Sequence, residues 1–543
     1  MAKKTTRREF IKLASIAAAS MTTIGCMSSK FVNKLAEEGK NPSDYPVVVI
    51  GSGMGGLASA VYLSKAGFPV TVIEQHNVPG GYATAFKRGD FNFDVSLHFF
   101  GLPEDIYQEL GLEGKVERIP LDLKRRIIRK DSDITIPKLS PEQLITTLIE
   151  RYPNEKDGIR SYFEFCFAVV DELTRFGKKM ETGSVFLPSM PLQYPKMWSL
   201  RNISLSDLLN KYIKDPMLIK SLNIANCLIT GLPSSQLSGI WGAAYTGSMV
   251  KMQFYYFKSR SQDLSNGLAS VIKDNKGALV YNRTVNKIFT DKNRVIGVQT
   301  EDGAAYPAKI VVSNANAPDT FGKFLSDNKK AQKHMEQLAQ YKPSISTFLI
   351  WLGLKGEYHG KGNEHSIYID SEYDIETDFK NYLACNAEKS SISITLYDNY
   401  YKGYSKPGTS TLNIFMESGY EPWRRFEKDY FAGNKEEYNR EKMRIAQILI
   451  KRVEEKAIPG LSSMIQVMEA ATPLTNMKYT KNPEGAIYGY PPTTNNAFTN
   501  RVKNSTPVDG LYLSSGWGYI HGSYYGGIMN GRDVYRLVMK DIK

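Results

Sequence analysis

Cysteines, long apolar runs and repeats are scarce in this chain. Only four of its 543 residues are cysteine and none form a C-x-x-C pair, so neither a disulfide framework nor a zinc centre is indicated. No stretch reaches the roughly 18 uninterrupted apolar residues that span a bilayer, so an integral membrane protein is not expected. Repeats and low-complexity stretches are also missing, and the length predicts two or more globular domains.

The first 26 residues read as a targeting segment, because basic residues precede a short apolar stretch from Leu13 to Gly25. Arg7-Arg8, followed by Phe10 and Lys12, resembles the twin-arginine export signal. The residues before Cys26 resemble a bacterial lipobox with threonine in place of the usual leucine. We expect export by the twin-arginine route, to the periplasm or to a membrane anchor through lipid on Cys26. A plain cleavage site and an uncleaved anchor are the alternatives.

The net charge is +13, of which the first 26 residues contribute +4; the remaining +9 predicts a protein that lies against an anionic membrane surface. Nucleic acid is not an expected partner, because the basic residues are dispersed. The densest basic run, residues 124–130, alternates with aliphatic residues like a strand or a membrane-facing edge.

A nucleotide-binding signature follows a strand predicted over Pro46 to Ile50. Its G-x-G-x-x-G motif consists of Gly51, Ser52, Gly53, Met54, Gly55 and Gly56. These glycines allow a tight turn, close approach of a pyrophosphate and close packing of the next helix, predicted over Leu57 to Ala66. A second strand, Val70 to Ile73, leads to Glu74 and Gln75, where an acidic side chain binds a ribose hydroxyl. This order predicts a dinucleotide site.

The next motifs are Pro79-Gly80-Gly81, Phe91-Asn92-Phe93-Asp94 and Ser96 to Gly101. With them the chain resembles the FAD-dependent group of phytoene desaturases, carotenoid isomerases and retinol saturases. The resemblance implies that Gly80 and Gly81 touch the phosphates of FAD. Two positions depart from the family pattern: Tyr82 stands where many members have arginine, and Ser96 replaces a usual glycine.

The resemblance continues over nearly the whole chain after the targeting segment. Three short strands are predicted at Arg283 to Thr290, Arg294 to Thr300 and Ala304 to Ser313. The resemblance implies that Val285 holds the adenine, and that the stretch from Glu469 to Tyr490 lies near the flavin. A final strand, Gly510 to Ser514, and a helix from about Gly527 enclose a glycine-rich turn. Its implied cofactor-binding residues are Gly516, Trp517, Gly526 and Gly527, and a further glycine, Gly531, is also expected to let the backbone approach the cofactor.

The expected fold class is α/β, a two-domain FAD-dependent oxidoreductase in which a Rossmann-like FAD domain is interleaved with a mixed α+β substrate domain. After the signal (1–26) and a polar linker (27–43), the FAD domain is expected at 44–130, 263–320 and 466–543. The substrate domain is expected at 131–262 and 321–465, where aromatic residues predict apolar walls.

The expected chemistry is hydride transfer with FAD on carbon–carbon double bonds of a polyene or isoprenoid-like lipid, without a metal. The resemblance places four candidate proton donors near the flavin: His98, His521, Tyr488 and Tyr519. Reduction, desaturation and isomerisation are all open at this point. Since no second G-x-G-x-x-G indicates a nicotinamide domain, export would make a membrane quinone or an exported electron carrier the expected electron partner.

Two alternatives use the same fold. One is an FAD-dependent amine or steroid oxidase or dehydrogenase. The other is a prenyl-lipid carrier with a Rab-GDI-like fold that has lost its flavin. Retention of Glu74, Gly80 and Gly81 argues against the carrier, and His98 with the Thr-Pro-Leu-Thr and Asn-Pro-Glu-Gly segments favours double-bond chemistry.

Overall fold

The computed structural model describes residues 41–542 except 97, 182–186 and 498–499. The predicted export signal, Cys26 and most of the predicted linker therefore lie outside the described residues. The predicted domain boundaries stay a prediction.

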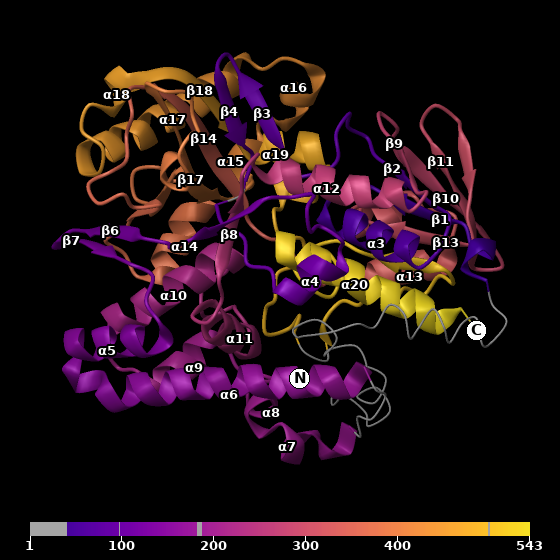
Figure 1. The fold of residues 1–543 in the computed structure, drawn as a ribbon, viewed down its shortest axis with the longest axis horizontal. Coiled ribbons are helices and arrows are strands. Elements are labelled where there is room, and N and C mark those ends of the chain that lie inside the picture. Colours follow the sequence, from indigo (N-terminus) through magenta and orange to yellow (C-terminus); the bar gives the residue numbers. More distant parts are fainter. Residues whose placement is uncertain (1–40, 97, 182–186, 498–499, 543) are drawn as a thin grey trace.

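A five-stranded parallel sheet forms the first layer, at the right of Figure 1, with the order β19-β13-β1-β2-β9. Its strands are β1 (Val47–Ile50), β2 (Val70–Ile73), β9 (Ala278–Val280), β13 (Ile310–Ser313) and β19 (Leu511–Leu513). Strand β1 is buried over its whole length, as expected for a central parallel strand covered on both faces. The helices α3 (Met54–Lys65), α12 (Ser261–Asp274) and α20 (Tyr524–Asp541) pack together beside it.

The predicted elements of this layer are confirmed, with one correction. The stretch predicted as one strand from Ala304 to Ser313 divides into two strands in different sheets. Strand β12 (Ala305–Pro307) completes an antiparallel sheet with β10 (Val285–Asp291) and β11 (Arg294–Thr300), whereas β13 joins the parallel sheet. Burial explains the division, because β12 is largely exposed while all four residues of β13 are buried.

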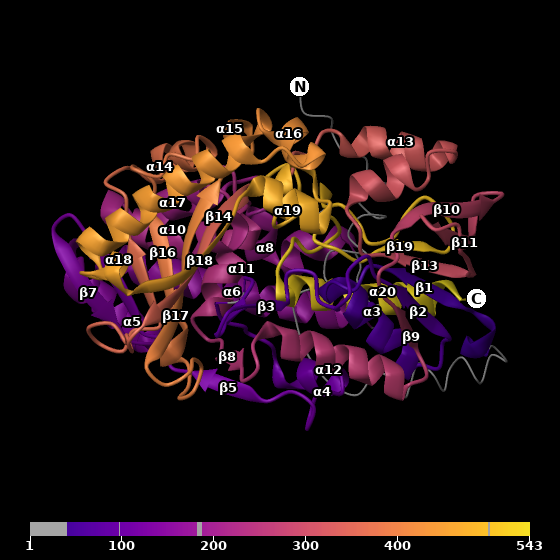
Figure 2. The ribbon, with the colours of Figure 1, turned by 90° about the horizontal axis from the view of Figure 1, so that it is seen from above.

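A seven-stranded sheet forms the second layer, in the order β18-β14-β17-β16-β15-β6-β7. Its strands are β6 (Arg125–Arg129), β7 (Ser132–Ile136), β14 (Ser346–Lys355), β15 (Ser366–Ile369), β16 (Ile392–Leu396), β17 (Thr409–Ser418) and β18 (Ile465–Ala471). The basic run thus forms an interior strand between β7 and β15. One face packs against α17 (Glu436–Lys456), which crosses the sheet in Figure 2.

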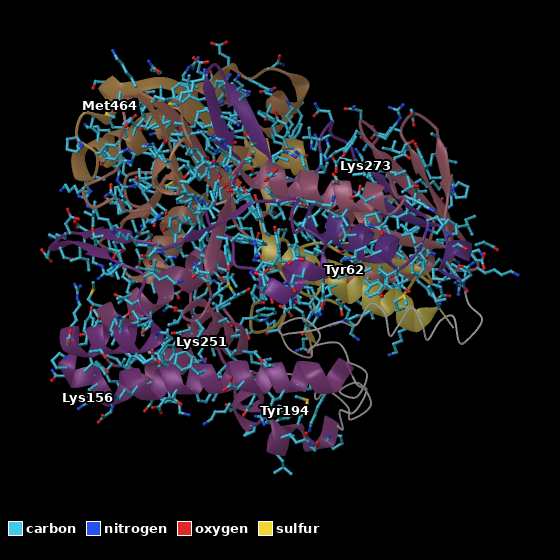
Figure 3. All side chains as sticks on the ribbon, in the orientation of Figure 1. Tyr62, Lys156, Tyr194, Lys251, Lys273 and Met464 are labelled. Carbon is cyan, nitrogen blue, oxygen red and sulfur yellow. The ribbon has the colours of Figure 1, made fainter. Side chains whose placement is uncertain are left out.

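Helices opposite the other face of this sheet make the third layer, at the lower left of Figure 1. They are α5 (Pro141–Arg151), α6 (Lys156–Glu181), α7 (Met190–Gln193), α8 (Pro195–Ser199), α9 (Leu205–Tyr212), α10 (Pro216–Thr230) and α11 (Gly239–Met249). Figure 3 marks Lys156 at the start of α6 and Tyr194 just before α8. The ring of Tyr194 lies 5.2 Å from that of Phe176 on α6. Among the described residues, no helix has the length and apolar content needed to cross a membrane.

The remaining elements connect these layers. Two antiparallel pairs are the hairpin of β3 (Ala85–Arg88) with β4 (Phe91–Asp94), and β5 (Arg118–Leu121) with β8 (Phe254–Phe257), which are distant in sequence. The other helices are α4 (Glu104–Glu109), α13 (Lys329–Leu338), α14 (Ile375–Leu383), α15 (Glu421–Arg424), α16 (Glu427–Ala432), α18 (Leu461–Met464) and α19 (Pro473–Thr480). Helix α20, predicted to begin near Gly527, begins at Tyr524 because the Ser523 hydroxyl caps it by accepting from the Gly526 amide.

Candidate functional site

The glycine motif forms a cradle between β1 and α3. Gly51 has a φ of +87°, which disfavours other residues, and Gly53 is the N-cap of α3. No side chain caps this helix, so its first amide groups are available to an anionic ligand. A Cβ on Gly55 would lie 2.1 Å from the Ser514 carbonyl oxygen, and a Cβ on Gly56 2.1 Å from that of Gly51. The last two glycines therefore serve close backbone packing.

Glu74 closes the side of the cradle at the end of β2. Its side chain is buried, and Oε2 accepts hydrogen bonds of 2.7 Å from both the amide and the hydroxyl of Ser52. Oε1 accepts a bond of 2.9 Å from the amide of His76. These bonds fix the carboxylate beside the glycine turn, where its remaining lone pairs can accept from ribose hydroxyls.

Gly80 and Gly81 form the opposite wall. The Gly80 amide donates to the Ser52 carbonyl oxygen at 2.9 Å, and Gly80 pairs with Gly53 in an isolated parallel bridge. Both Gly80 and Gly81 have positive φ, +130° and +60°. The cradle is therefore walled by glycine backbone from two segments, the turn at Gly53 and the turn at Gly80 and Gly81.

The two departures from the family pattern contact each other. The Ser96 hydroxyl donates to the carbonyl oxygen of Tyr82 at 3.1 Å, and the Tyr524 hydroxyl donates to the same oxygen at 2.8 Å. All three residues line the cavity described below. Ser96 therefore supports the backbone of Tyr82, and the two changes form one local arrangement.

The cradle opens into a continuous cavity of about 2020 Å³. Each strand of the seven-stranded sheet contributes to its lining, with Ala471, Leu349, Phe415, Thr395, Ser366, Ile127 and Ile134 as examples from β18 to β7. Helices α5, α6, α10 and α11 contribute apolar side chains such as Leu148, Phe163, Leu222 and Ala244. Since single ligand pockets usually measure about 300–1000 Å³, this volume can hold a dinucleotide together with a second large ligand.

Most predicted cofactor-binding residues line this cavity: Gly51, Gly53, Met54, Gly55, Glu74, Gln75, Gly80, Gly81, Val285, Gly516, Trp517 and Gly527. Gly56 and Gly526 are not among the lining residues in the described part of the chain. The expectation that Gly526 and Gly531 let the backbone approach the cofactor stays a prediction, and contacts within the protein already require glycine at both positions. A Cβ on Gly526 would lie 2.3 Å from the His521 carbonyl oxygen, and one on Gly531 2.6 Å from Ala58 Cβ. Both glycines serve packing within the protein.

His98 lines the cavity beside the seven-stranded sheet. Its Nδ1 lies 2.7 Å from the Thr395 hydroxyl, and its ring meets that of Phe415 edge-on at 5.8 Å. Burial lowers the pKa of His98 to about 4. The imidazole is therefore neutral at pH 7.

His521 lies one layer behind the cavity wall. It is fully buried, and both ring nitrogens lie 2.9 Å from the hydroxyl of Tyr245, which itself lines the cavity. Burial lowers the pKa of His521 to about 4 as well. His521 is therefore separated from the cavity by lining residues that include Tyr245, Trp241 and Tyr488.

The two tyrosine candidates differ in position. Tyr488 lines the cavity with its ring 5.8 Å from that of His521, and burial raises its pKa well above the ordinary value. Tyr519 is buried in the core, its carbonyl oxygen accepts from Arg501 Nε at 2.6 Å, and it is not among the described lining residues. Of the four candidates, His98 and Tyr488 line the cavity, and His521 lies behind the lining in contact with Tyr245.

Sequence reasoning did not single out Tyr245 or Arg125, which both line the cavity. Tyr245 follows Trp241 by one helical turn on α11, a spacing equally typical of core packing. Arg125 was visible only as part of a basic run. In the described part of the chain, no group of three His, Cys, Asp or Glu side chains is arranged to hold a metal ion.

Comparison with known proteins agrees with this geometry. A family model described as an NAD(P)-binding Rossmann-like domain matches residues 49–110. Solved structures match the whole arrangement: an oxidoreductase from Methanosarcina mazei has a TM-score of 0.59 at 16% identity, covering 90% of this chain and 100% of its own. Cyclohexylamine oxidase from Brevibacterium oxydans has a TM-score of 0.58 at 15% identity, covering 91% and 99%. At these identities the likeness establishes the fold, which is the predicted α/β oxidoreductase fold.

Relatives by sequence extend the similarity over most of the chain. A chloroplastic prolycopene isomerase from Arabidopsis thaliana is 27% identical over 525 residues, which cover 91% of this chain and 82% of that protein. An all-trans-retinol 13,14-reductase from Danio rerio is 25% identical, covering 89% and 85%. A lycopene-forming phytoene desaturase from Pantoea ananas is 26% identical, covering 60% and 67%. The chain is therefore a distant relative of the carotenoid isomerases, retinol reductases and phytoene desaturases, which confirms the resemblance predicted from its motifs.

Proposed function

We propose that this protein is an FAD-dependent enzyme that acts on carbon–carbon double bonds of a polyene or isoprenoid-like lipid. The observation that carries the proposal is the single cavity that joins the dinucleotide cradle to an apolar chamber. A polyene offers no polar handle along its chain, so a dry apolar chamber is the environment in which it can lie beside a redox cofactor.

The residues present fit FAD. The uncapped start of α3 with Gly53 and Gly80–Gly81 would hold the pyrophosphate, Glu74 the ribose and Val285 the adenine. Gly516, Trp517 and Tyr488 line the stretch between this cradle and the apolar chamber. When bound, FAD supplies hydride chemistry, while the protein supplies position and exclusion of water.

The protonation state of the two histidines bears on the proton transfers that the site can perform. His98 and His521 both have a pKa of about 4, so neither holds a transferable proton as imidazolium at pH 7. Saturation takes up one proton from the surroundings for each double bond reduced, whereas geometric isomerisation takes up and releases no proton overall. The two neutral imidazoles exclude only proton transfer from an imidazolium, so saturation, desaturation and isomerisation all stay candidate reactions. In this reading Thr395 and Tyr245 fix the two imidazoles in place as uncharged hydrogen-bonding groups.

The amine or steroid oxidase alternative rests on the fold, which the solved amine oxidases share at 12–15% identity. The relatives by sequence at 25–27% identity are named for polyene and retinol chemistry instead. An amine oxidase would reduce its flavin on addition of an alkylamine, so cyclohexylamine and putrescine are the direct controls for this alternative.

The decisive experiment is anaerobic. The flavin of the purified protein is photoreduced, and its visible absorbance and the substrate are followed after addition of all-trans-retinol or a cis-carotenoid. Unchanged absorbance with altered double-bond geometry would establish isomerisation, and reoxidation with loss of a double bond would establish reduction. Reduction of the oxidised flavin by an amine, with no change in either polyene, would contradict the proposal.

Replacing Gly53 with alanine is expected to weaken FAD binding at least tenfold, about 1.4 kcal/mol, without unfolding the protein. Its φ of −66° suits alanine, and the added Cβ would meet only the Asn314 side-chain oxygen at 2.5 Å, which can rotate away. The methyl group would still separate a pyrophosphate from the start of α3. Flavin released on dilution measures the effect.

The matched control is Gly322→Ala, where the nearest atom would be Met335 Cγ at 3.9 Å. Equal flavin retention by Gly53→Ala and Gly322→Ala would show that the cradle does not bind the pyrophosphate.

We also propose that the protein is exported by the twin-arginine route and works at a membrane surface, with a quinone or an exported electron carrier as electron partner. Arg7-Arg8 and the net charge of +9 after the first 26 residues support this, as does Leu192 on α7, which is 86% exposed beside Gln193, the acceptor of a hydrogen bond from Lys179. Fractionation of cells expressing the full chain and an Arg7→Lys, Arg8→Lys variant tests it, since export requires the arginine pair. Equal export of both proteins would contradict the proposal.

A further inference from the structure

Strand β6 sends its arginines to opposite faces of the seven-stranded sheet. Side chains alternate along a strand, and Arg125, Ile127 and Arg129 line the cavity whereas Arg126 and Ile128 are buried on the other face. Figure 1 shows β6 at the opposite end of the molecule from β1, the strand that leads into the cradle. The arginines of one short strand can therefore be compared directly.

Two of these arginines are neutralised by carboxylates. Arg126 Nη2 lies 2.6 Å from Asp133 Oδ2, and Arg129 Nε lies 2.8 Å from Asp370 Oδ2. Arg125 differs, because its guanidinium makes no ion pair or hydrogen bond within the described residues. Its recorded contact is with the ring of Phe99, whose centroid lies 5.2 Å from Cζ.

The surroundings of Arg125, which is partly exposed, combine apolar side chains with the nearby Tyr400. It lies opposite Ile136 across the β6–β7 pair, and the Phe99 ring that it covers stacks edge-on against Phe254 at 4.9 Å. Burial lowers the pKa of the Arg125 guanidinium, yet an arginine keeps its charge at pH 7 in every protein environment. A charge withdrawn from water without a partner is costly, and a ligand that brings a negative charge would remove that cost.

We propose that Arg125 binds the terminal carboxylate of a polyene or isoprenoid acid. The inference rests on the proposed function and names the substrate class of the same cavity. One guanidinium matches one carboxylate through two parallel hydrogen bonds, whereas a diphosphate would require further cations. The hydroxyl of Ser366, which pairs with Arg125 in the β15–β6 register and lines the cavity, adds a neutral donor.

The register also orients the chain of such a ligand. Arg125 pairs with Ser366, and Ser366 pairs with Thr395 on β16, the residue that contacts His98. Two strand spacings separate Arg125 from Thr395, about 10 Å. A carboxylate on Arg125 would therefore direct the apolar chain across the sheet towards His98 and the cradle.

Equilibrium binding tests this without turnover. All-trans-retinoic acid and all-trans-retinol carry the same chain and differ in the head group, and their binding to the flavin-loaded full chain at pH 7.5 is followed by quenching of tryptophan fluorescence. We expect Arg125→Gln to weaken binding of the acid at least tenfold and to leave retinol binding and flavin content within about twofold of the unsubstituted protein. Arg125→Lys should keep part of the preference, because it keeps the charge without the planar fork.

The matched control is Arg151→Gln, which removes an exposed guanidinium from α5 that also lines the cavity. It should bind both ligands like the unsubstituted protein. If Arg125→Gln binds both retinol and the acid as tightly as the unsubstituted protein does, this inference is overturned and the proposed function still stands. Loss of acid binding in Arg151→Gln alone would also overturn it. Failure of both ligands to bind the unsubstituted protein would instead remove the proposed function on which it rests.

Discussion

Replacing Asp94 with alanine is expected to lower the free energy of unfolding by about 3 kcal/mol or more. Asp94 is fully buried at the end of β4, and Oδ2 accepts hydrogen bonds of 2.8 Å from both the Tyr256 hydroxyl and the Ser261 amide. Oδ1 accepts from the Ser261 hydroxyl at 3.0 Å. Alanine would leave these buried donors without an acceptor, which is the expensive way to lose a hydrogen bond.

The position of Ser261 increases the expected effect. Ser261 is the first residue of α12, and its own N-cap, Arg260, has a φ of 69° and provides no side-chain cap. The Asp94 carboxylate therefore caps α12 from a distant hairpin, where its negative charge also suits the positive end of the helix. One carboxylate thus joins β4, β8 and α12, so its loss should loosen three elements around the cavity together.

The measurement is the thermal midpoint by circular dichroism, at a fixed scan rate and with excess FAD so that flavin release does not contribute. Asp90→Ala is the matched control on the same hairpin, because the ion pair of Asp90 with Lys406 is 71% and 60% exposed and such pairs contribute about 0–1 kcal/mol. The thermal midpoint of Asp94→Asn should lie between those of Asp94→Ala and Asp90→Ala, since the asparagine side chain retains one acceptor oxygen. Equal midpoints for Asp94→Ala and Asp90→Ala would refute the capping role.

The role of Asp94 illustrates what the sequence could and could not predict. The Phe-x-Phe-Asp motif was recognisable as a family element, but its partners lie more than 150 residues away in sequence. Local patterns sufficed for β1, the glycine turn, α3, β2 and Glu74, because that whole unit is built from contacts within one short segment. The strand–turn–helix–strand elements of the cradle were therefore predicted, and the roles of its residues in cofactor binding stay a prediction.

The seven-stranded sheet could not be predicted in the same way. It pairs β6 with β15, so that Arg125 lies beside Ser366, and no local periodicity encodes such a distant pairing. Alternation along β6 implied two faces but not which face meets the cavity. Arg125 and Arg126 are neighbours in one basic run, and only the tertiary arrangement gives one a carboxylate partner and the other a place in the cavity.

His521 shows a different limit. Its neighbourhood was predicted from the resemblance, yet a position near the cofactor segment does not decide whether a side chain reaches the ligand. Tyr245 and Trp241, from a helix far away in sequence, line the cavity and pack against His521, which does not itself line it in the described part of the chain. The packing of α11 against the C-terminal segment, which no motif describes, settles that order.

Glu417→Gln is expected to flatten the dependence of stability on pH. Glu417 is 2% exposed on β17, its Oε1 makes no hydrogen bond within the described residues, and burial, with a smaller contribution from Asp378, raises its pKa from 4.5 to about 8. Between these two values the folded protein holds a proton that the unfolded chain has lost. The free energy of unfolding therefore falls as the pH rises through this window, by roughly 5 kcal/mol for the complete shift.

Glutamine cannot titrate, so the variant should lose this contribution, while Asp378, which lines the same small void, is present in both proteins. The added amide brings its own pH-independent cost, and for that reason the slope between pH 5 and pH 9 decides the result rather than the stability at one pH. Denaturant midpoints across this range give the slope. Glu421→Gln, on the exposed surface in an ion pair with Arg424, should keep the slope of the unsubstituted protein.

A protonated Glu417 would also matter for the chemistry. Glu417 is the second cause, after burial, of the raised pKa of Tyr488, and Tyr488 lines the cavity between the cradle and the apolar chamber. A neutral Glu417 keeps uncompensated negative charge away from this wall at pH 7, in agreement with a site built for an uncharged polyene chain. If the slopes of Glu417→Gln and the unsubstituted protein coincide, Glu417 is ionised in the folded protein, and the wall behind Tyr488 carries a negative charge that the proposed apolar chamber does not allow.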